Sequence, residues 1–300
     1  MYQEKRAARA TFVRIRTLDY HVLEWGRPAP GEVPIVMLHG WMDVAASWQF
    51  VVDAFEGEHW VIAPDLRGFG LTRSPGADFH WFGDLVADLD FLLDRYSPQT
   101  AVNLVGHSLG GNVTTMYAGF RPQRVRRLVN LEGYGLECDS PANVPTRFAN
   151  WMDQLKAHHR HELELKSYDS AEAFAQRLMK SNPRLARDKA DWLARHWARQ
   201  DEQGAWRVLA DPSHKIARPH LFRPEEMQET WRRIVAATLM VEASDPMPQA
   251  WQEQFAIREA RERLAWIRDC RLSRIEDAGH MMHHDQPQQL AQLIESFVAT

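Results

Sequence analysis

Cysteine is scarce in this sequence: only Cys138 and Cys270 occur in 300 residues, far apart and in no C-x-x-C pattern. The sequence therefore indicates neither a disulfide framework nor a thiolate metal site, and a reducing compartment fits this composition. No apolar run approaches the ~18 residues that a membrane span requires. Lys5, Arg6 and Arg9 would suit a transit peptide, but the stretch around them lacks serine and leads directly into a strand-like run. We expect a cytoplasmic protein without a membrane span.

An excess of positive charge is also lacking, since 36 Lys and Arg residues stand against 40 Asp and Glu residues, a formal net charge of −4. This balance argues against a nucleic-acid partner. No repeat of about 20–50 residues and no low-complexity tract is present, which excludes solenoids and propellers. Hydrophobic residues at 45% and charged residues at 25% are typical of a globular chain. The length predicts one domain with an inserted segment.

Strand-like and helix-like runs alternate along the first half of the chain. Two segments with alternating polarity, Thr11–Arg16 and Tyr20–Trp25, predict an opening hairpin. Short, largely apolar runs then predict central parallel strands covered on both faces: Ile35–Leu38, Trp60–Ala63, Val102–Val105 and Leu128–Leu131. Helical periodicity lies between them in Ser47–Phe55, Phe82–Tyr96 and Leu109–Phe120. This alternation is typical of an α/β fold with a doubly wound, mostly parallel sheet.

The alternation stops after Leu131 for about a hundred residues. It resumes with a strand at Ala237–Val241, a helix at Gln249–Leu264, a strand at Cys270–Ile275 and a helix at Pro287–Val298. We therefore expect a core made of residues 1–136 and 234–300, interrupted by a helical cap at 137–233 that shows no strand pattern. Five tryptophans of this cap either hold its helices against the sheet or line an apolar pocket: Trp151, Trp192, Trp197, Trp206 and Trp231.

The most specific motif is a strand that runs through Gly106-His107-Ser108-Leu109-Gly110 into a helix. A G-x-S-x-G sequence between a strand and a helix forms a sharp turn that exposes the serine hydroxyl, and its glycines avoid clashes with the neighbouring backbone. The motif predicts Ser108 as a nucleophile.

At this point the sequence resembles the α/β-hydrolase superfamily. The resemblance rests on His39-Gly40-Trp41, on Pro64–Gly70, on the Ser108 turn and on Gly279-His280. It implies an eight-stranded, mostly parallel sheet, a helical cap after the sixth strand, and a nucleophile, acid and histidine in that chain order. It also implies that the Pro64–Gly70 turn is structural rather than a phosphate-binding loop.

A serine hydroxyl needs a base within hydrogen-bond reach and a third group that fixes the tautomer of that base. His280, behind a glycine after the last predicted strand, is the predicted base. The resemblance favours Asp245 as the acid, because it follows the seventh strand. Glu132, at the end of the sixth strand, and Glu242 are the alternatives.

The oxyanion of an acyl-transfer intermediate requires preorganised N–H donors, and the resemblance assigns them to Trp41 and Leu109. His39, Gly40, His107 and the Trp41 ring are the expected substrate-binding residues. The run from His280 through His283 and His284 to Asp285 does not have the pattern of a metal site. We expect neither a metal nor a cofactor.

Three functions fit these residues. The favoured one is a serine hydrolase, esterase-like, that cleaves a carboxylic ester or a related thioester, amide or C–C bond of a small, apolar acyl substrate. The second is a ligand-binding or signalling protein on a hydrolase fold, and the third is a cofactor-free lyase or oxygenase. The sequence leaves the substrate and the oligomeric state open.

Overall fold

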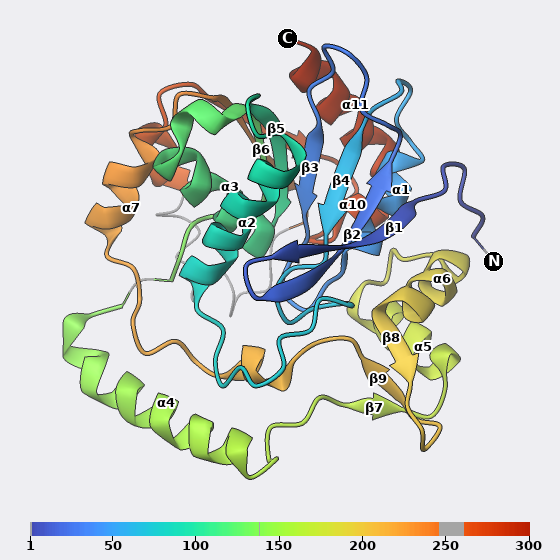
Figure 1. Ribbon diagram of the computed structural model, residues 1–300, viewed down its shortest axis with the longest axis vertical. Helices are drawn as coiled ribbons and strands as arrows, with labels where there is room; N and C mark the ends of the chain where they lie inside the picture. The colour runs from blue at the N-terminus through green and yellow to red at the C-terminus, as the bar shows by residue number, and fades with distance from the viewer. Residues whose placement is uncertain (1, 138, 246–260) are drawn as a thin grey trace.

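The computed structural model, which describes residues 2–137, 139–245 and 261–300, is built around one central sheet (Figure 1). Its eight strands lie in the order β1-β2-β4-β3-β5-β6-β10-β11. Only β2 runs antiparallel to its neighbours β1 and β4, so the predicted mostly parallel α/β-hydrolase sheet is confirmed. The strands are β1 (Arg9–Ile15), β2 (Leu18–Trp25), β3 (Ile35–Leu38), β4 (Val61–Pro64), β5 (Val102–His107), β6 (Val125–Leu131), β10 (Ala237–Ala243) and β11 (Cys270–Ile275).

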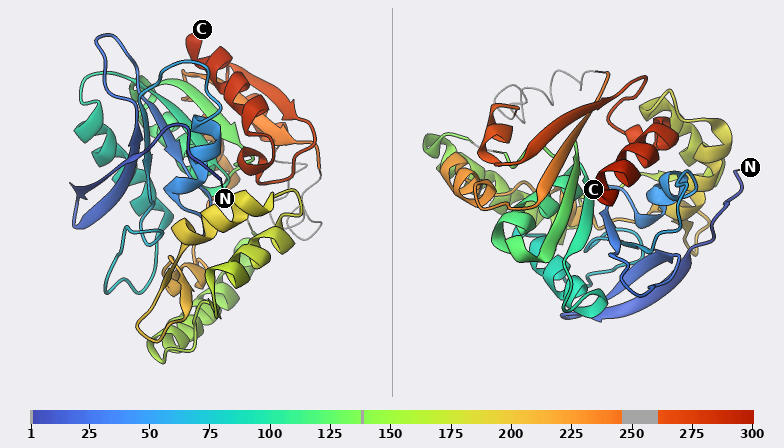
Figure 2. Two further views of the ribbon diagram at one scale, coloured as in Figure 1. Left: turned by 90° about the vertical axis from the view of Figure 1, so that its right-hand side faces the viewer. Right: turned by 90° about the horizontal axis from the view of Figure 1, so that it is seen from above.

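Helices cover both faces of the sheet, which explains why the central strands β3 and β4 are apolar throughout (Figures 1 and 2). One face packs against α2 (Phe82–Tyr96), α3 (Leu109–Phe120) and α7 (Pro224–Trp231). The other packs against α1 (Gln49–Val52), α10 (Met282–Asp285) and α11 (Pro287–Ala299). The two buried clusters on these faces form the core.

The helices predicted at 82–96, 109–120 and 287–298 are confirmed within a residue. The helix predicted at 47–55 is instead a 3-10 turn, η1 (Ala45–Trp48), followed by the short α1. Most of the helix predicted at Gln249–Leu264 lies outside the described residues. The chain then forms a 3-10 turn, η5 (Leu264–Trp266), ahead of β11.

The segment between β6 and β10 contains both helices and short strands. After η2 (Pro122–Arg124) and β6, it comprises η3 (Pro141–Asn143), α4 (Val144–His159), β7 (Ser167–Tyr168), α5 (Ala171–Ser181), α6 (Arg187–Trp197), β8 (Ala198–Gln200), β9 (Trp206–Val208) and η4 (Pro212–Lys215). The strands form an antiparallel sheet in the order β7-β9-β8, so the prediction of a strand-free insertion was wrong. Strands of two or three residues are too short to show alternating polarity.

The last helix of the predicted cap, α7, packs on the core. Helix α7 lies against α3, and its Met227 and Trp231 are buried in the same cluster as the sheet. A Cβ on Gly119 would lie 2.2 Å from the Thr230 carbonyl oxygen, so these two helices approach closely. Residues 224–233 therefore pack as part of the core. In contrast, α4 has no buried residue and projects away from the sheet (Figure 1).

Aromatic contacts attach the insertion to the core. Trp192 packs against Phe50 with ring centroids 5.5 Å apart, and Trp197 packs against His284 at 6.2 Å. Both tryptophans are only 7% exposed, as expected for side chains that hold the insertion in place. On the other side of the insertion, His214 stacks between Phe69 and His80 at 3.8 and 3.9 Å. Among the described residues, no helix is both long and apolar enough to cross a membrane.

Candidate functional site

Ser108 lies in a strained turn between β5 and α3. Its backbone has φ 52° and ψ −111°, a left-handed conformation that costs a non-glycine residue about 1–3 kcal/mol. The Ser108 N–H donates to the Leu131 carbonyl at 2.8 Å, which ties the turn to the end of β6. The surrounding structure thus imposes the conformation that brings Ser108 to the carboxyl edge of the sheet.

Glycines let three backbone segments meet at this turn. A Cβ on Gly106 would lie 2.3 Å from the Gly110 carbonyl oxygen, and one on Gly110 would lie 2.3 Å from the Leu38 carbonyl oxygen. A Cβ on Gly40 would lie 3.4 Å from the Ser108 Cβ and 2.9 Å from His107 Nδ1. The loop after β3 therefore lies directly against Ser108.

His280 lies beside this turn and is hydrogen-bonded to Glu132. Its Nδ1 is 2.7 Å from Glu132 Oε2, and its carbonyl oxygen accepts from His107 Nε2 at 2.8 Å. Glu132 is 5% exposed and has φ 53°, and its Oε1 accepts from the Ala243 N–H at 2.9 Å. Since a carboxylate beside Nδ1 accepts the proton there, it leaves Nε2 as the basic nitrogen of the ring.

The other two candidate carboxylates are paired with arginines. Asp245, the acid favoured by the sequence, lies 2.5 Å from Arg184 and its side chain is 43% exposed. Glu242 forms a two-pronged pair with Arg261, with both oxygens at 2.7 Å. Of the three candidate carboxylates, the one hydrogen-bonded to His280 is therefore Glu132, not Asp245. The reason is local, because the left-handed backbone at Glu132 and the neighbouring β10 hold its side chain at the end of the sheet.

Two expected substrate-binding residues are buried within the structure instead. His39 is 0% exposed; its Nδ1 donates to the Gly40 carbonyl at 2.8 Å and its Nε2 accepts from the Leu66 N–H at 2.9 Å. His107 is 1% exposed, with Nε2 bound to the His280 carbonyl. These rings are held in place by hydrogen bonds to neighbouring loops. Gly40 is buried as well, whereas the Trp41 ring is 53% exposed.

The predicted oxyanion donors flank the Ser108 turn. Leu109 is the first residue of α3, and Trp41 follows Gly40 in the loop that lies against Ser108. Among the described residues, neither of these N–H groups donates a backbone hydrogen bond outside the helices and strands. We therefore expect both N–H groups to be open to an anion, which the N-terminus of α3 also favours.

The turn after β4 braces the site. Asp65 accepts from the Ala45 and Leu71 N–H groups, both at 2.8 Å. Arg67 forms a two-pronged pair with buried Asp88 at 2.7 and 2.8 Å. The charged groups of this turn are thus hydrogen-bonded to other parts of the protein, as expected for a structural loop.

A buried polar cluster behind Ser108 was not foreseen from the sequence. Asp43, His107 and His283 come from three segments, and one ligand-type atom of each lies within 4.8 Å of the others. Burial lowers the pKa of His107 well below its usual value, and burial does the same for neighbouring His284. Burial alone would raise the pKa of Asp43, but interaction with His283 lowers it. The sequence placed His283 and His284 near each other, yet only the fold brings Asp43 and His107 to them.

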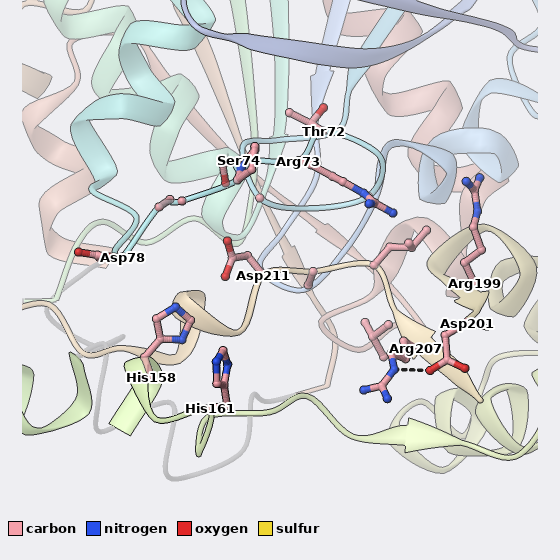
Figure 3. Close-up of a pocket in the computed structure, with 18 of the residues that line it drawn as sticks. Thr72, Arg73, Ser74, Asp78, His158, His161, Arg199, Asp201, Arg207 and Asp211 are labelled. Atoms are coloured by element: carbon pink, nitrogen blue, oxygen red, sulfur yellow. Dashed lines mark hydrogen bonds and ion pairs between the residues drawn. The ribbon is translucent and has the colours of Figure 1, made fainter. Parts of the chain in front are cut away.

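A pocket of about 670 Å³ lies between the core and the insertion (Figure 3). The 68–78 loop, the end of α4, and β8 and β9 line it, with Asp211 between the two sides. Arg207 is paired with Asp201 at 2.5 Å within it. Its described lining includes neither Ser108 nor His280. None of the five tryptophans of the insertion lines this pocket.

Comparisons with known proteins agree with this architecture. The sequence profile described as "Alpha/beta hydrolase family" matches residues 35–293. A "Serine hydrolase-like protein" of Danio rerio is 30% identical over 189 residues, which cover 60% of this chain but only 55% of that protein. "Serine hydrolase-like protein 2" of Homo sapiens is 24% identical over 286 residues, 88% of this chain and 86% of that protein.

Among solved structures, the "Thioesterase Domain From Curacin Biosynthetic Pathway" superposes with a TM-score of 0.80. The superposition covers 97% of this chain and 99% of that domain at 20% sequence identity. At this identity the likeness extends to the fold alone.

Proposed function

The chain belongs to the alpha/beta hydrolase family, and from that premise we propose that it is a serine hydrolase acting on a carboxylic ester or a related acyl bond. Ser108 is the nucleophile, His280 the base and Glu132 the carboxylate that orients His280. The observation that carries this proposal is the hydrogen bond of 2.7 Å between His280 Nδ1 and Glu132 Oε2 beside the strained Ser108 turn.

The proposed reaction starts with the Ser108 hydroxyl. Its oxygen attacks the acyl carbon while His280 Nε2 takes its proton, and Glu132 stabilises the resulting imidazolium. The negative oxygen of the tetrahedral intermediate is met by the N–H groups of Leu109 and Trp41. When the intermediate collapses, His280 returns the proton to the departing alcohol or thiol. His280 Nε2 then takes a proton from a water molecule, and the water oxygen attacks the acyl carbon. As this second intermediate collapses, His280 returns the proton to the Ser108 oxygen and the carboxylic acid is released.

The strain at Ser108 supports this role. A positive φ at a non-glycine residue persists only where the surrounding structure imposes it, and such residues concentrate at functional sites. Ser108 and Glu132 both have positive φ, at 52° and 53°, as does Met42 in the loop after β3 at 55°. Three strained residues thus lie on the three segments to which we assign the nucleophile, the acid and one oxyanion donor.

The test combines turnover with covalent trapping. Wild type is assayed on a panel of p-nitrophenyl esters and acyl thioesters, and a fluorophosphonate probe is used to label the active serine. We expect Ser108→Ala to reduce kcat at least about a thousandfold, with residual activity from the oxyanion donors, and to abolish labelling. Ser296→Ala, a serine on the exposed side of α11, is the matched control and should retain both.

Other results would point to the other functions. Ligand binding without labelling of Ser108 or turnover would favour a binding protein. Turnover that survives Ser108→Ala but not His280→Ala would favour a lyase or oxygenase that uses only the base.

A further inference from the structure

The cluster of Asp43, His107 and His283 is buried completely. The three residues are 2%, 1% and 0% exposed. Asp43 follows the loop of Gly40 and Trp41, His107 ends β5, and His283 lies in α10. The serine hydrolase mechanism proposed above uses none of these three side chains as a reacting group.

Several polar atoms of this cluster lack a hydrogen-bond partner among the described residues. They are Asp43 Oδ2, His107 Nδ1 and both ring nitrogens of His283. A buried polar atom without a partner costs about 1–3 kcal/mol, so several in one place require an explanation. The remaining polar side-chain atoms of Asp43 and His107 do have hydrogen-bond partners. Asp43 Oδ1 accepts from the Val44 N–H and from the Ser47 hydroxyl, and His107 Nε2 binds the His280 carbonyl.

The hydrogen bonds fix which atoms face the cluster. A carbonyl only accepts, so His107 carries its proton on Nε2 and, as a neutral ring, presents a lone pair at Nδ1. Asp43 Oδ2 is a second acceptor. His283 Nε2, 3.5 Å from Asp43 Oδ2, can donate one proton at most, which leaves an acceptor without a donor. A cation at the centre would satisfy Asp43 Oδ2, His107 Nδ1 and one ring nitrogen of His283 together.

We propose that Asp43, His107 and His283 form a binding site for one divalent transition-metal ion of the zinc type. Two imidazoles and a carboxylate are ligands that Zn²⁺ takes in proteins. The separation of 3.5 Å between Asp43 Oδ2 and His283 Nε2 is near the edge, about 3.3–3.4 Å, of a tetrahedron with metal–ligand bonds of about 2.0–2.1 Å. The hydrogen bond from the other nitrogen of His107 to a backbone carbonyl is the usual outer support of a metal-binding histidine.

The ion would join three segments that the fold otherwise holds by packing. Asp43 belongs to the loop of the oxyanion donor Trp41, His107 precedes Ser108, and His283 follows His280 by three residues. Binding at this site would therefore stabilise the relative positions of these loops without an ion at the reacting atoms. Its expected signature is a raised melting temperature, whether or not any substrate is turned over.

The test uses the full chain, freed of metal with a chelator and then offered Zn²⁺ or Co²⁺ alone. Because the site is buried, each ion is added both to the native protein and during refolding. We expect one ion per chain to remain after gel filtration, a higher melting temperature, and the visible absorption of four-coordinate Co²⁺. Asp43→Asn and His283→Gln should each weaken binding at least about tenfold.

Two matched variants identify the site. His284→Gln changes the adjacent buried histidine outside the proposed ligand set, and His280→Gln changes the predicted base; both should bind Zn²⁺ within about threefold of wild type. Loss of binding in His280→Gln with retention in Asp43→Asn would place the ion at the catalytic histidine and overturn the proposal. Absence of stoichiometric binding by wild type after refolding would overturn it too, leaving a hydrated polar cluster as the explanation. The wild-type measurement decides the matter even if a variant fails to fold.

Discussion

Replacement of Glu132 by glutamine is the most informative single change, because it alters one hydrogen bond at a nearly constant shape. The carboxylate accepts from the Ala243 N–H through Oε1 and faces His280 Nδ1 through Oε2. An amide has only one oxygen. Glutamine must therefore keep that oxygen toward Ala243 and turn its NH₂ group toward His280, or leave a buried N–H group unpaired.

With an NH₂ donor opposite Nδ1, His280 must accept there and carry its proton on Nε2. This is the wrong tautomer for a base that takes a proton from Ser108. An equivalent carboxylate-to-amide change in a serine protease triad lowers kcat by roughly 10⁴-fold, which corresponds to about 5.5 kcal/mol in the barrier. We expect Glu132→Gln to reduce kcat by a similar factor, with KM changed much less.

Asp245→Asn and Glu242→Gln are the matched controls. The Asp245–Arg184 pair is about two-fifths exposed on both sides, and such pairs contribute at most about 1 kcal/mol to stability. Glu242 is 7% exposed and held by Arg261, so its loss should reduce stability more than catalysis. Both variants should retain kcat within about tenfold.

The assay is kcat and KM on the best ester or thioester, together with the rate of fluorophosphonate labelling of Ser108, which needs no known substrate. Thermal unfolding checks that each variant is folded. If Asp245→Asn were the most impaired and Glu132→Gln retained near-normal labelling, the assignment of the acid from the hydrogen bond would be refuted.

Three further changes test the packing around the site. Gly110→Ala should prevent stable folding, because its Cβ would lie 2.3 Å from the Leu38 carbonyl oxygen; soluble, active protein with an unchanged melting temperature would contradict this. Trp197→Ala should lower the free energy of unfolding by about 3–5 kcal/mol without changing the preference among acyl chain lengths, measured as relative kcat/KM. Burial lowers the pKa of His214 to about 3, so the folded protein binds fewer protons there than the unfolded chain, and stability should fall as pH drops from about 6.5 toward 3. His214→Phe, compared with wild type by denaturant titration across this range, should reduce this loss of unfolding free energy by up to about 1.4 kcal/mol per pH unit. The same pH dependence of the unfolding free energy in both proteins would contradict the role of His214.

Motifs that combine a chemical group with a fixed backbone geometry were predictable from the sequence. Ser108 lies where the G-x-S-x-G pattern placed it, between a strand that begins at the predicted residue and ends two residues later than predicted, and a helix with the predicted bounds. The apolar runs of the central strands were equally informative, because burial on both faces favours apolar residues at most of their positions. Local sequence alone determines both features.

The partner of His280 could not be predicted in the same way. Glu132, Glu242 and Asp245 all lie at the carboxyl ends of neighbouring strands, and the sequence does not show which side chain reaches the histidine. That depends on the positive φ at Glu132 and on the arginines that pair with the other two carboxylates. Arg184 comes from the insertion, about sixty residues away from Asp245 along the chain. The Asp43 cluster is a similar case, since its members are far apart in sequence.

The place of Glu132 directly before the insertion has an evolutionary consequence. In the function proposed above, the nucleophile, both oxyanion loops and the carboxylate that contacts His280 precede the insertion, and only the histidine follows it. Lineages can therefore lengthen, shorten or exchange the segment between β6 and β10 without altering the acid. The loop after β10 does not need to supply the acid either, so the sequence of this loop can diverge while the reaction is retained. New substrate preferences can thus arise in the insertion while the chemistry is inherited unchanged.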